Sequence, residues 1–227
     1  MNDIESYFNK ISEQIEKCYE IANKARSKGY DPELKTAIPL AKTMAERVEG
    51  LVSAAAPEIT GMGVPSRIYE LEGQYGKLDW RVALQISLEV AQQKLCKFST
   101  ELRAMETGIR IGMAYLTLGI VSSPLEGFVE LKIKKRRDGK DYFCLMYSGP
   151  IRSAGGTAGA LSAVIADYIR KNMGYDVYDA TEKEVRRMVT ELYDYHERVT
   201  NLQYLPSEKE IRFLVKNLPL QIDGDPS

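Results

Sequence analysis

The sequence predicts an α+β fold that is predominantly helical, with a small antiparallel β-hairpin sheet. Two patterns support this prediction. Several segments repeat apolar residues every three or four positions, which is the period of an amphipathic helix. Residues 129–134 instead alternate apolar and charged side chains, which is the period of a half-buried strand. With 44% hydrophobic and 28% charged residues, the 227-residue chain has the composition of a globular protein.

The first 52 residues are predicted to form an N-terminal helical segment. One helix is expected over residues 3–27, ending at Gly29, and a second from Pro39 to about Val52. An amphipathic helix needs a surface that covers its apolar side, either in the same domain or on another subunit. The apolar stripe of the first helix comprises Ile4, Phe8, Ile11, Ile15, Cys18, Ala22 and Ala25.

Residues 53–77 are predicted to be an irregular connector, because glycine and proline recur throughout them. The remainder, residues 78–227, is predicted to be a helix-rich α+β core. Its first element is a long helix that Asp79 can cap. The apolar pattern of this helix continues through Gly108 and Gly112, where we expect bends or close contacts with neighbouring elements.

A β-hairpin is predicted next. Asp138-Gly139 is a favoured tight-turn dipeptide, and residues 142–147 form the return strand. A glycine-rich connection over residues 148–157 then leads into an apolar helix that Gly174 closes.

The C-terminal part of the core is predicted to mix short strands and helices. Residues 175–178 and 218–222 are strand candidates. Two capping boxes are each expected to open a helix, Thr181 with Glu184 and Ser207 with Glu210.

The glycine-rich connection is the first candidate site. Glycines let the backbone approach an anion, and the unpaired N–H groups at the following helix start favour negative charge. The candidate phosphate-binding residues are Arg152, Ser153, Gly155, Gly156 and Thr157. Neither the GxxxxGK[ST] nor the GxGxxG nucleotide fingerprint is met. The alternative interpretation is that these glycines permit tight packing of the helix on the strand.

The hairpin tip is the second candidate site. Six basic residues and one acidic residue, Asp138, lie between Lys132 and Lys140. A turn with this local charge can contact phosphates without reading bases. Alternatively, the charges are simply solvated, and lysines guard the strand edge. The candidate DNA contacts are Lys134, Lys135, Arg136, Arg137 and Lys140.

No catalytic residues and no metal site are predicted. The three cysteines are far apart and the chain has one histidine, so a zinc site is not expected. Asp176, Asp179 and Glu182 do not complete a metal site at helical spacing. Asp223-Gly224-Asp225 is interpreted as a turn rather than as the paired carboxylates of a metal-dependent polymerase.

Charge and cysteine usage limit the other function classes. The formal net charge is −1, so any binding of nucleic acid must come from a local patch. The longest uncharged stretch has 15 residues and is too short and too polar to cross a bilayer, so no membrane role is expected. An odd cysteine count fits a reducing cytosol, and a cytoplasmic location is expected.

Four segments carry a resemblance to a known family. In chain order they are LAKTMAERVEGLV, METGIRIGMAYLTLGIVSSPLEGFVELKIKKRRDGKDYF, SGPIRSAGGTAGALSAVIADYIR and VRRMVTELYDYHERVTNLQYLPSEKEI. Together they resemble the N-terminal region of the large subunit of archaeal DNA polymerase II, the D family. The similarity covers essentially the whole chain in order.

This resemblance implies what the parent protein does. It would be the large subunit of a replicative DNA-directed DNA polymerase, a nucleotidyltransferase that synthesises DNA from dNTPs on a primer-template. Its small-subunit partner would carry the 3′–5′ exonuclease. The family's catalytic aspartates and zinc-binding cysteines have no counterpart here, so magnesium and zinc are expected elsewhere in the parent protein and no cofactor is expected in this segment.

The expected role of this segment is therefore non-catalytic. It supports assembly with the small subunit and the remainder of the large subunit, and it contacts the phosphate backbone of primer-template DNA. Two alternatives stay open. One is a pure protein–protein assembly module that uses residues 3–52, with the 149–157 loop serving only packing. The other is an independent enzyme that binds a phosphate ligand through the glycine-rich loop.

Overall fold

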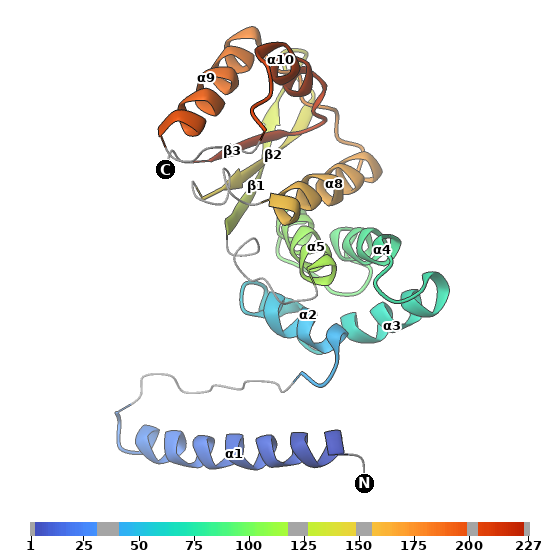
Figure 1. Cartoon of the computed structure of the whole chain (residues 1–227). Coiled ribbons are helices and arrows are strands. Elements are labelled where there is room, and N and C mark those ends of the chain that lie inside the picture. The colour runs from blue at the N-terminus through green and yellow to red at the C-terminus, as the bar shows by residue number, and fades with distance from the viewer. Residues whose placement is uncertain (1–2, 31–40, 118–126, 149–155, 199–203, 225–227) are drawn as a thin grey trace.

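The computed structural model describes residues 3–30, 41–117, 127–148, 156–198 and 204–224 (Figure 1). It confirms the predicted fold class, since helices dominate and the sheet is small. The described helices are α1 (Asp3–Arg26), α2 (Met44–Ser53), the 3₁₀ turn η1 (Pro57–Ile59), α3 (Val64–Tyr75), α4 (Trp80–Ala91), α5 (Glu101–Leu116), α8 (Gly156–Asn172), α9 (Glu182–Arg198) and α10 (Glu208–Asn217). The strands are β1 (Phe128–Lys135), β2 (Asp141–Tyr147) and β3 (Gln221–Gly224).

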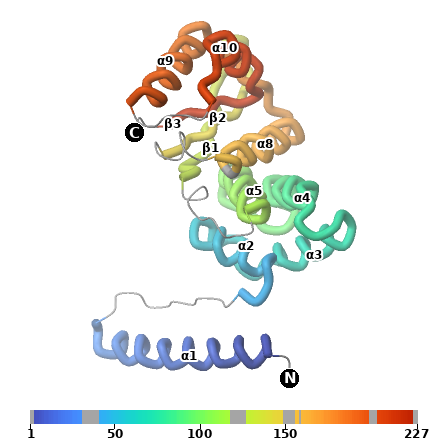
Figure 2. The backbone as a smooth tube through the Cα atoms, viewed as in Figure 1, coloured from blue at the N-terminus to red at the C-terminus, as the bar shows by residue number. Residues whose placement is uncertain are grey.

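The N-terminal helices differ in what they bury. α1 forms as predicted, but none of its residues is buried, and Figure 2 shows it set apart from the other elements. α2 begins at Met44, where the Thr43 hydroxyl accepts a hydrogen bond from the Glu46 N–H. Pro39, the predicted start, lies outside the described residues. Unlike α1, α2 packs three of its residues into the core: Ala45, Val48 and Val52.

The prediction of an irregular connector over residues 53–77 is wrong for its second half, because α3 occupies residues 64–75. Gly63, Pro65 and Gly76 mark the ends of this helix. Gly63 is the N-cap with φ 87°, and Pro65 lies in the first turn, where its missing N–H has no intrahelical partner to lose. Gly76 ends the helix with φ 101°. The three-part division into domains stays a prediction.

The long helix predicted from Asp79 is two packed helices, α4 and α5. Asp79 caps α4 as predicted, and Thr100 provides a new cap for α5 by accepting from the Arg103 N–H at 3.1 Å. Gln93, with φ 56°, adopts the left-handed conformation in the connection between them. The chain reverses here because α4 and α5 each carry an apolar face that the other covers.

Helix α5 joins two hydrophobic cores. Towards α2, α3 and α4 it contributes Ile111 and Tyr115 to one buried cluster. Towards α8 and the sheet it contributes Ile109 and Met113 to the other. The predicted close contacts at Gly108 and Gly112 are confirmed. A Cβ on Gly108 would lie 2.4 Å from the Ser87 carbonyl oxygen of α4. The backbones of α4 and α5 can therefore come this close only because Gly108 has no side chain.

The sheet has the order β1-β2-β3. β1 and β2 form the predicted antiparallel hairpin, with Lys134 opposite Tyr142. β3 adds a strand that runs parallel to β2, so the sheet is mixed rather than a hairpin alone. The strand predicted at 175–178 is wrong. It makes only one bridge, Tyr142 with Asp176, because the backbone then turns away and the Tyr178 N–H donates to the Pro219 carbonyl.

β2 is buried on both faces, which explains its continuous apolar sequence. Phe143 and Leu145 face the core shared with α5 and α8. Cys144 lies in a small cluster on the opposite face with Tyr142 and Tyr178.

α9 and α10 form a helix pair beside the sheet (Figure 1). Both begin at the predicted capping boxes, with Thr181 bonded to Glu184 and Ser207 bonded to Glu210. No helix among the described residues combines the length and the apolarity needed to cross a membrane.

Candidate nucleic-acid interface

The glycine-rich connection falls only partly within the described residues. Gly156 and Thr157 are the first residues of α8; both are exposed, and Gly156 has φ 54°. Arg152, Ser153 and Gly155 lie outside the described residues. The phosphate site predicted here therefore stays a prediction.

The hairpin tip is fully described. The tight turn is closed by two backbone hydrogen bonds, from the Arg136 N–H to the Lys140 carbonyl at 2.8 Å and from the Gly139 N–H to the Arg136 carbonyl at 3.0 Å. Gly139 has φ 84°, which favours glycine at this position. The turn therefore gathers the predicted basic residues at one end of the sheet.

The three most exposed basic side chains of the tip each contact a carboxylate. The Arg137 Nε donates to an Asp179 oxygen at 2.9 Å. The Lys135 Nζ lies 2.8 Å from Asp141, and the Lys140 Nζ lies 3.4 Å from Asp176. The side chains nevertheless remain exposed: Lys135 by 68%, Arg137 by 71% and Lys140 by 60%.

Arg136 is more enclosed than its neighbours. Its Nη1 donates to the Val177 carbonyl at 2.8 Å and lies 3.9 Å from Asp176. Its Nε lies 3.2 Å from Asp138, but the N–H is not aligned with that carboxylate, so this contact is electrostatic rather than a hydrogen bond. Arg136 therefore ties the turn to the 176–179 backbone.

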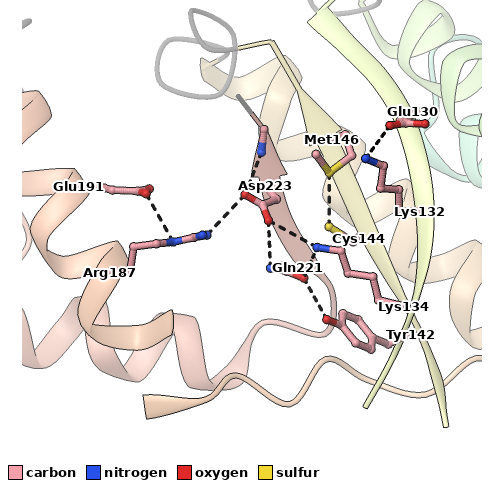
Figure 3. Close-up of polar contacts among 11 residues, drawn as sticks. Glu130, Lys132, Lys134, Tyr142, Cys144, Met146, Arg187, Glu191, Gln221 and Asp223 are labelled. Carbon is pink, nitrogen blue, oxygen red and sulfur yellow. Dashed lines mark hydrogen bonds and ion pairs between the residues drawn. The ribbon is translucent and has the colours of Figure 1, made fainter. Parts of the chain in front are cut away.

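Lys134 belongs to a polar network around Asp223 (Figure 3). The Asp223 carboxylate lies 3.5 Å from the Lys134 Nζ and 3.4 Å from Arg187 Nη2 of α9. Gln221 donates its amide to Asp223 at 3.2 Å and accepts from the Tyr142 hydroxyl at 3.0 Å. This network joins the hairpin, β3 and α9.

The turn interpretation of Asp223 is wrong. Asp223 lies in β3, in register with Met146 of β2. Asp223-Gly224 is typical of a turn, but the glycine has a different role here. Its backbone packs against Tyr147, and a Cβ on Gly224 would lie 2.0 Å from the Tyr147 carbonyl oxygen. Asp225 lies outside the described residues. Among the residues that are described, no three His, Cys, Asp or Glu side chains gather in a way that could hold a metal ion.

Hydrogen bonds and nearby cations lower the pKa of two of these carboxyls. For Asp179, the hydrogen bond from Arg137 is the largest cause. For Asp223, burial raises the pKa, but the Gly224 N–H and the nearby Arg187 and Lys134 cations outweigh it. Both groups are therefore ionised at neutral pH.

Asp223→Asn is expected to lower stability at pH 7 by about 1 kcal/mol, with a smaller effect at pH 3. A carboxyl with a depressed pKa stabilises the fold above the unfolded-state pKa, and this contribution is lost as the pH falls through the folded-state pKa, here below about 4. Thermal melts of the wild type and the variant at pH 7, 5 and 3 measure the difference between their stabilities. Asp194→Asn, at an exposed helix pair, is the control. An equal difference at pH 7 and pH 3 would contradict this role.

The charges of the hairpin cluster cancel. Its five cations are Lys134, Lys135, Arg136, Arg137 and Lys140, and their five partners are Asp138, Asp141, Asp176, Asp179 and Asp223. Sequence reasoning missed this balance because most partners are distant, with Asp179 lying 42 residues after Arg137. Asp176 and Asp179 are visible in the sequence as acidic residues, but only the fold brings them close to the cations of the hairpin.

Comparison with known proteins places the chain among the subunits of archaeal DNA polymerases. Residues 6–227 match the family described as DNA polymerase II large subunit DP2, N-terminal, and the chain belongs to this family.

Individual relatives agree with this assignment. The DNA polymerase II large subunit of Nanoarchaeum equitans is 48% identical over 97% of this chain, and that of Methanosarcina barkeri is 43% identical over 99%. The Pyrococcus abyssi protein is 43% identical over 98%. The chain spans only 18%, 19% and 15% of these three relatives, respectively.

Proposed function

We propose that this chain is a non-catalytic region of a DNA polymerase II large subunit and that it supports assembly of the polymerase through α1. One observation carries the proposal. A helix of 24 residues, with a continuous apolar stripe, has no buried residue. Within this stripe Ile4 is 62% exposed and Cys18 is also exposed. An amphipathic helix gains most of its stability by packing its apolar face, so α1 needs a protein partner.

The partner we propose is another part of the polymerase. The relatives are named large subunits, and the family resemblance points to a small exonuclease subunit and to the remainder of the large subunit. For the whole enzyme, we propose DNA synthesis by the large subunit and a 3′–5′ exonuclease in the small subunit. We also propose that its magnesium and zinc sites lie outside this chain and that the enzyme is cytoplasmic. The face of α1 that would dock carries Phe8, Ile11 and Ile15.

Removing residues 1–40 tests this proposal. We expect the shortened chain to lose association with the small subunit while its melting temperature stays within about 2 °C, since α1 buries nothing in the core. The deletion stops before Met44 because α2 belongs to the core. Analytical ultracentrifugation of the mixed subunits measures association. Unchanged association by the shortened chain would contradict a role for α1.

A second proposed role is contact with the DNA phosphate backbone at the hairpin tip and the start of α8. The observation that favours it is the exposure of Lys135, Arg137 and Lys140, which lie in or beside the tight turn. The first residues of α8, Gly156 and Thr157, are also exposed. Helix starts favour phosphate, and basic side chains hold it without reading bases. Fluorescence anisotropy of labelled primer-template DNA, titrated with salt, measures this contact.

A further inference from the structure

We infer that residues 176–179, here called the acidic clasp, compete with DNA phosphates for the cations of the hairpin tip. The inference rests on the second proposed role, DNA contact, and adds to it an autoinhibitory contact built into the fold. The clasp lowers the net charge of the tip, so that DNA phosphates must compete with its carboxylates for Arg137 and Lys140.

Three contacts join the clasp to the tip. Arg136 donates to the Val177 carbonyl at 2.8 Å, Arg137 donates to Asp179 at 2.9 Å, and Lys140 donates to Asp176 at 3.4 Å. They bring two carboxylates and one backbone carbonyl from the connection between α8 and α9 onto three successive cations of the hairpin turn.

The backbone of the clasp is fixed independently of these charges. The Asp176 N–H donates to the Asp141 carbonyl at 2.9 Å, and the Tyr178 N–H donates to the Pro219 carbonyl at 2.9 Å. Tyr178 as a residue is 8% exposed, and its ring packs on that of Tyr142 with centroids 5.3 Å apart. The backbone that carries Asp176 and Asp179 is thereby anchored beside the hairpin by contacts that do not involve the two carboxylates.

A phosphate competes for the same nitrogen atoms. A phosphate oxygen that accepts from Arg137 Nε must replace the Asp179 oxygen, because this nitrogen has a single N–H, and at Lys140 Nζ a phosphate shares the positive charge with Asp176. The clasp also reduces the long-range attraction, because Asp176 and Asp179 are two of the five carboxylates that lie against the cations of the tip. Each cation that is held by a carboxylate is one fewer to replace the counterions of the phosphates, so the clasp is expected to weaken binding to duplex DNA.

Neutralising the clasp should strengthen binding. In Asp176→Asn/Asp179→Asn the amides keep the side-chain shape but no longer balance the cations. We expect about tenfold tighter binding to a labelled duplex of arbitrary sequence at low salt, with a salt dependence steeper by one to two phosphate contacts, or roughly 0.9 to 1.8 in log–log slope.

Two further variants make the comparison specific. Glu13→Gln/Glu20→Gln changes the net charge by the same amount on the exposed α1, away from the tip. Adding Arg137→Ala and Lys140→Ala to the clasp variant removes the cations that the clasp frees and should return binding to the wild-type level or below. Circular dichroism of each variant shows that it is folded, and an unfolded clasp variant would itself overturn the inference, since the Tyr178 anchoring should keep the fold intact.

The outcomes separate the clasp from DNA contact itself. If the clasp variant binds no tighter than the α1 control, while Arg137→Ala/Lys140→Ala still weakens wild-type binding, the clasp is overturned and DNA contact at the hairpin stands. If neither wild type nor the clasp variant binds at low salt, DNA contact and the clasp are overturned together. Tighter binding by the clasp variant alone, reversed by removing the cations, supports the inference.

Discussion

Gly108→Ala is expected to lower the free energy of unfolding by about 2–4 kcal/mol. The new Cβ would lie 2.4 Å from the Ser87 carbonyl oxygen and 3.3 Å from the Ala91 nitrogen, both backbone atoms of α4. Backbone cannot rotate away as a side chain can, so α4 and α5 must separate. Because α5 joins both hydrophobic cores, this separation loosens packing on each side. Urea denaturation followed by far-UV circular dichroism measures the change.

Gly50→Ala is the matched control. Gly50 lies inside α2, and a Cβ there has no heavy atom within 4 Å. Alanine is the better helix former by about 1 kcal/mol, so this variant should be as stable as the wild type or slightly more stable. Equal destabilisation by both substitutions would contradict the close approach of α4 and α5.

Arg110→Met is the second substitution with a large expected effect, about 2–4 kcal/mol of destabilisation. The hairpin register shifts between Phe128 and Glu130, which leaves backbone groups at this point without strand partners. Arg110 Nη2 donates to the Phe128 and Val129 carbonyls at 3.0 and 2.8 Å. Methionine can fill the space but cannot donate, so both carbonyls would lose the hydrogen bond from Arg110, at Phe128 in a buried position.

The loss extends to Glu106, one turn earlier on α5. Its carboxylate accepts from the Leu131 N–H at 2.8 Å and lies 3.9 Å from Arg110, and its side chain is only 13% exposed. Without the arginine, a nearly buried negative charge loses its partner. Arg186→Met is the control, because that side chain is 72% exposed in a helix-surface pair and should change stability by less than about 0.5 kcal/mol. Denaturation of Arg110→Met and Arg186→Met under the same conditions measures both changes in stability.

Local signals in the sequence predicted most elements because caps and turns act over a few residues. The Ser207–Glu210 box and the Asp138-Gly139 turn are formed as predicted. The same local reasoning did not predict α3, because Gly63, Pro65 and Gly76 mark the ends of this helix rather than an irregular segment. It also merged α4 with α5, because only the packing of two apolar faces decides where a long amphipathic pattern folds back.

The candidate interface was predicted only in part, for a physical reason. The cations of the hairpin lie within a few residues of one another and are visible in the sequence. Their partners Asp179 and Asp223 come from the α8–α9 connection and from β3, and the fold alone brings them close. A run of basic residues therefore indicates where charge is concentrated, while the net charge of that surface depends on long-range contacts.

The most direct test of the proposed assembly role changes only the apolar face of α1. Isothermal titration of the small subunit with Ile11→Gln/Ile15→Gln should show at least tenfold weaker binding than wild type, because two large apolar side chains are removed from the docking face. Glu13→Gln/Glu20→Gln, on the opposite face of the same helix, should bind as the wild type does. Equal affinity for all three proteins would contradict the claim that α1 joins this region to the polymerase.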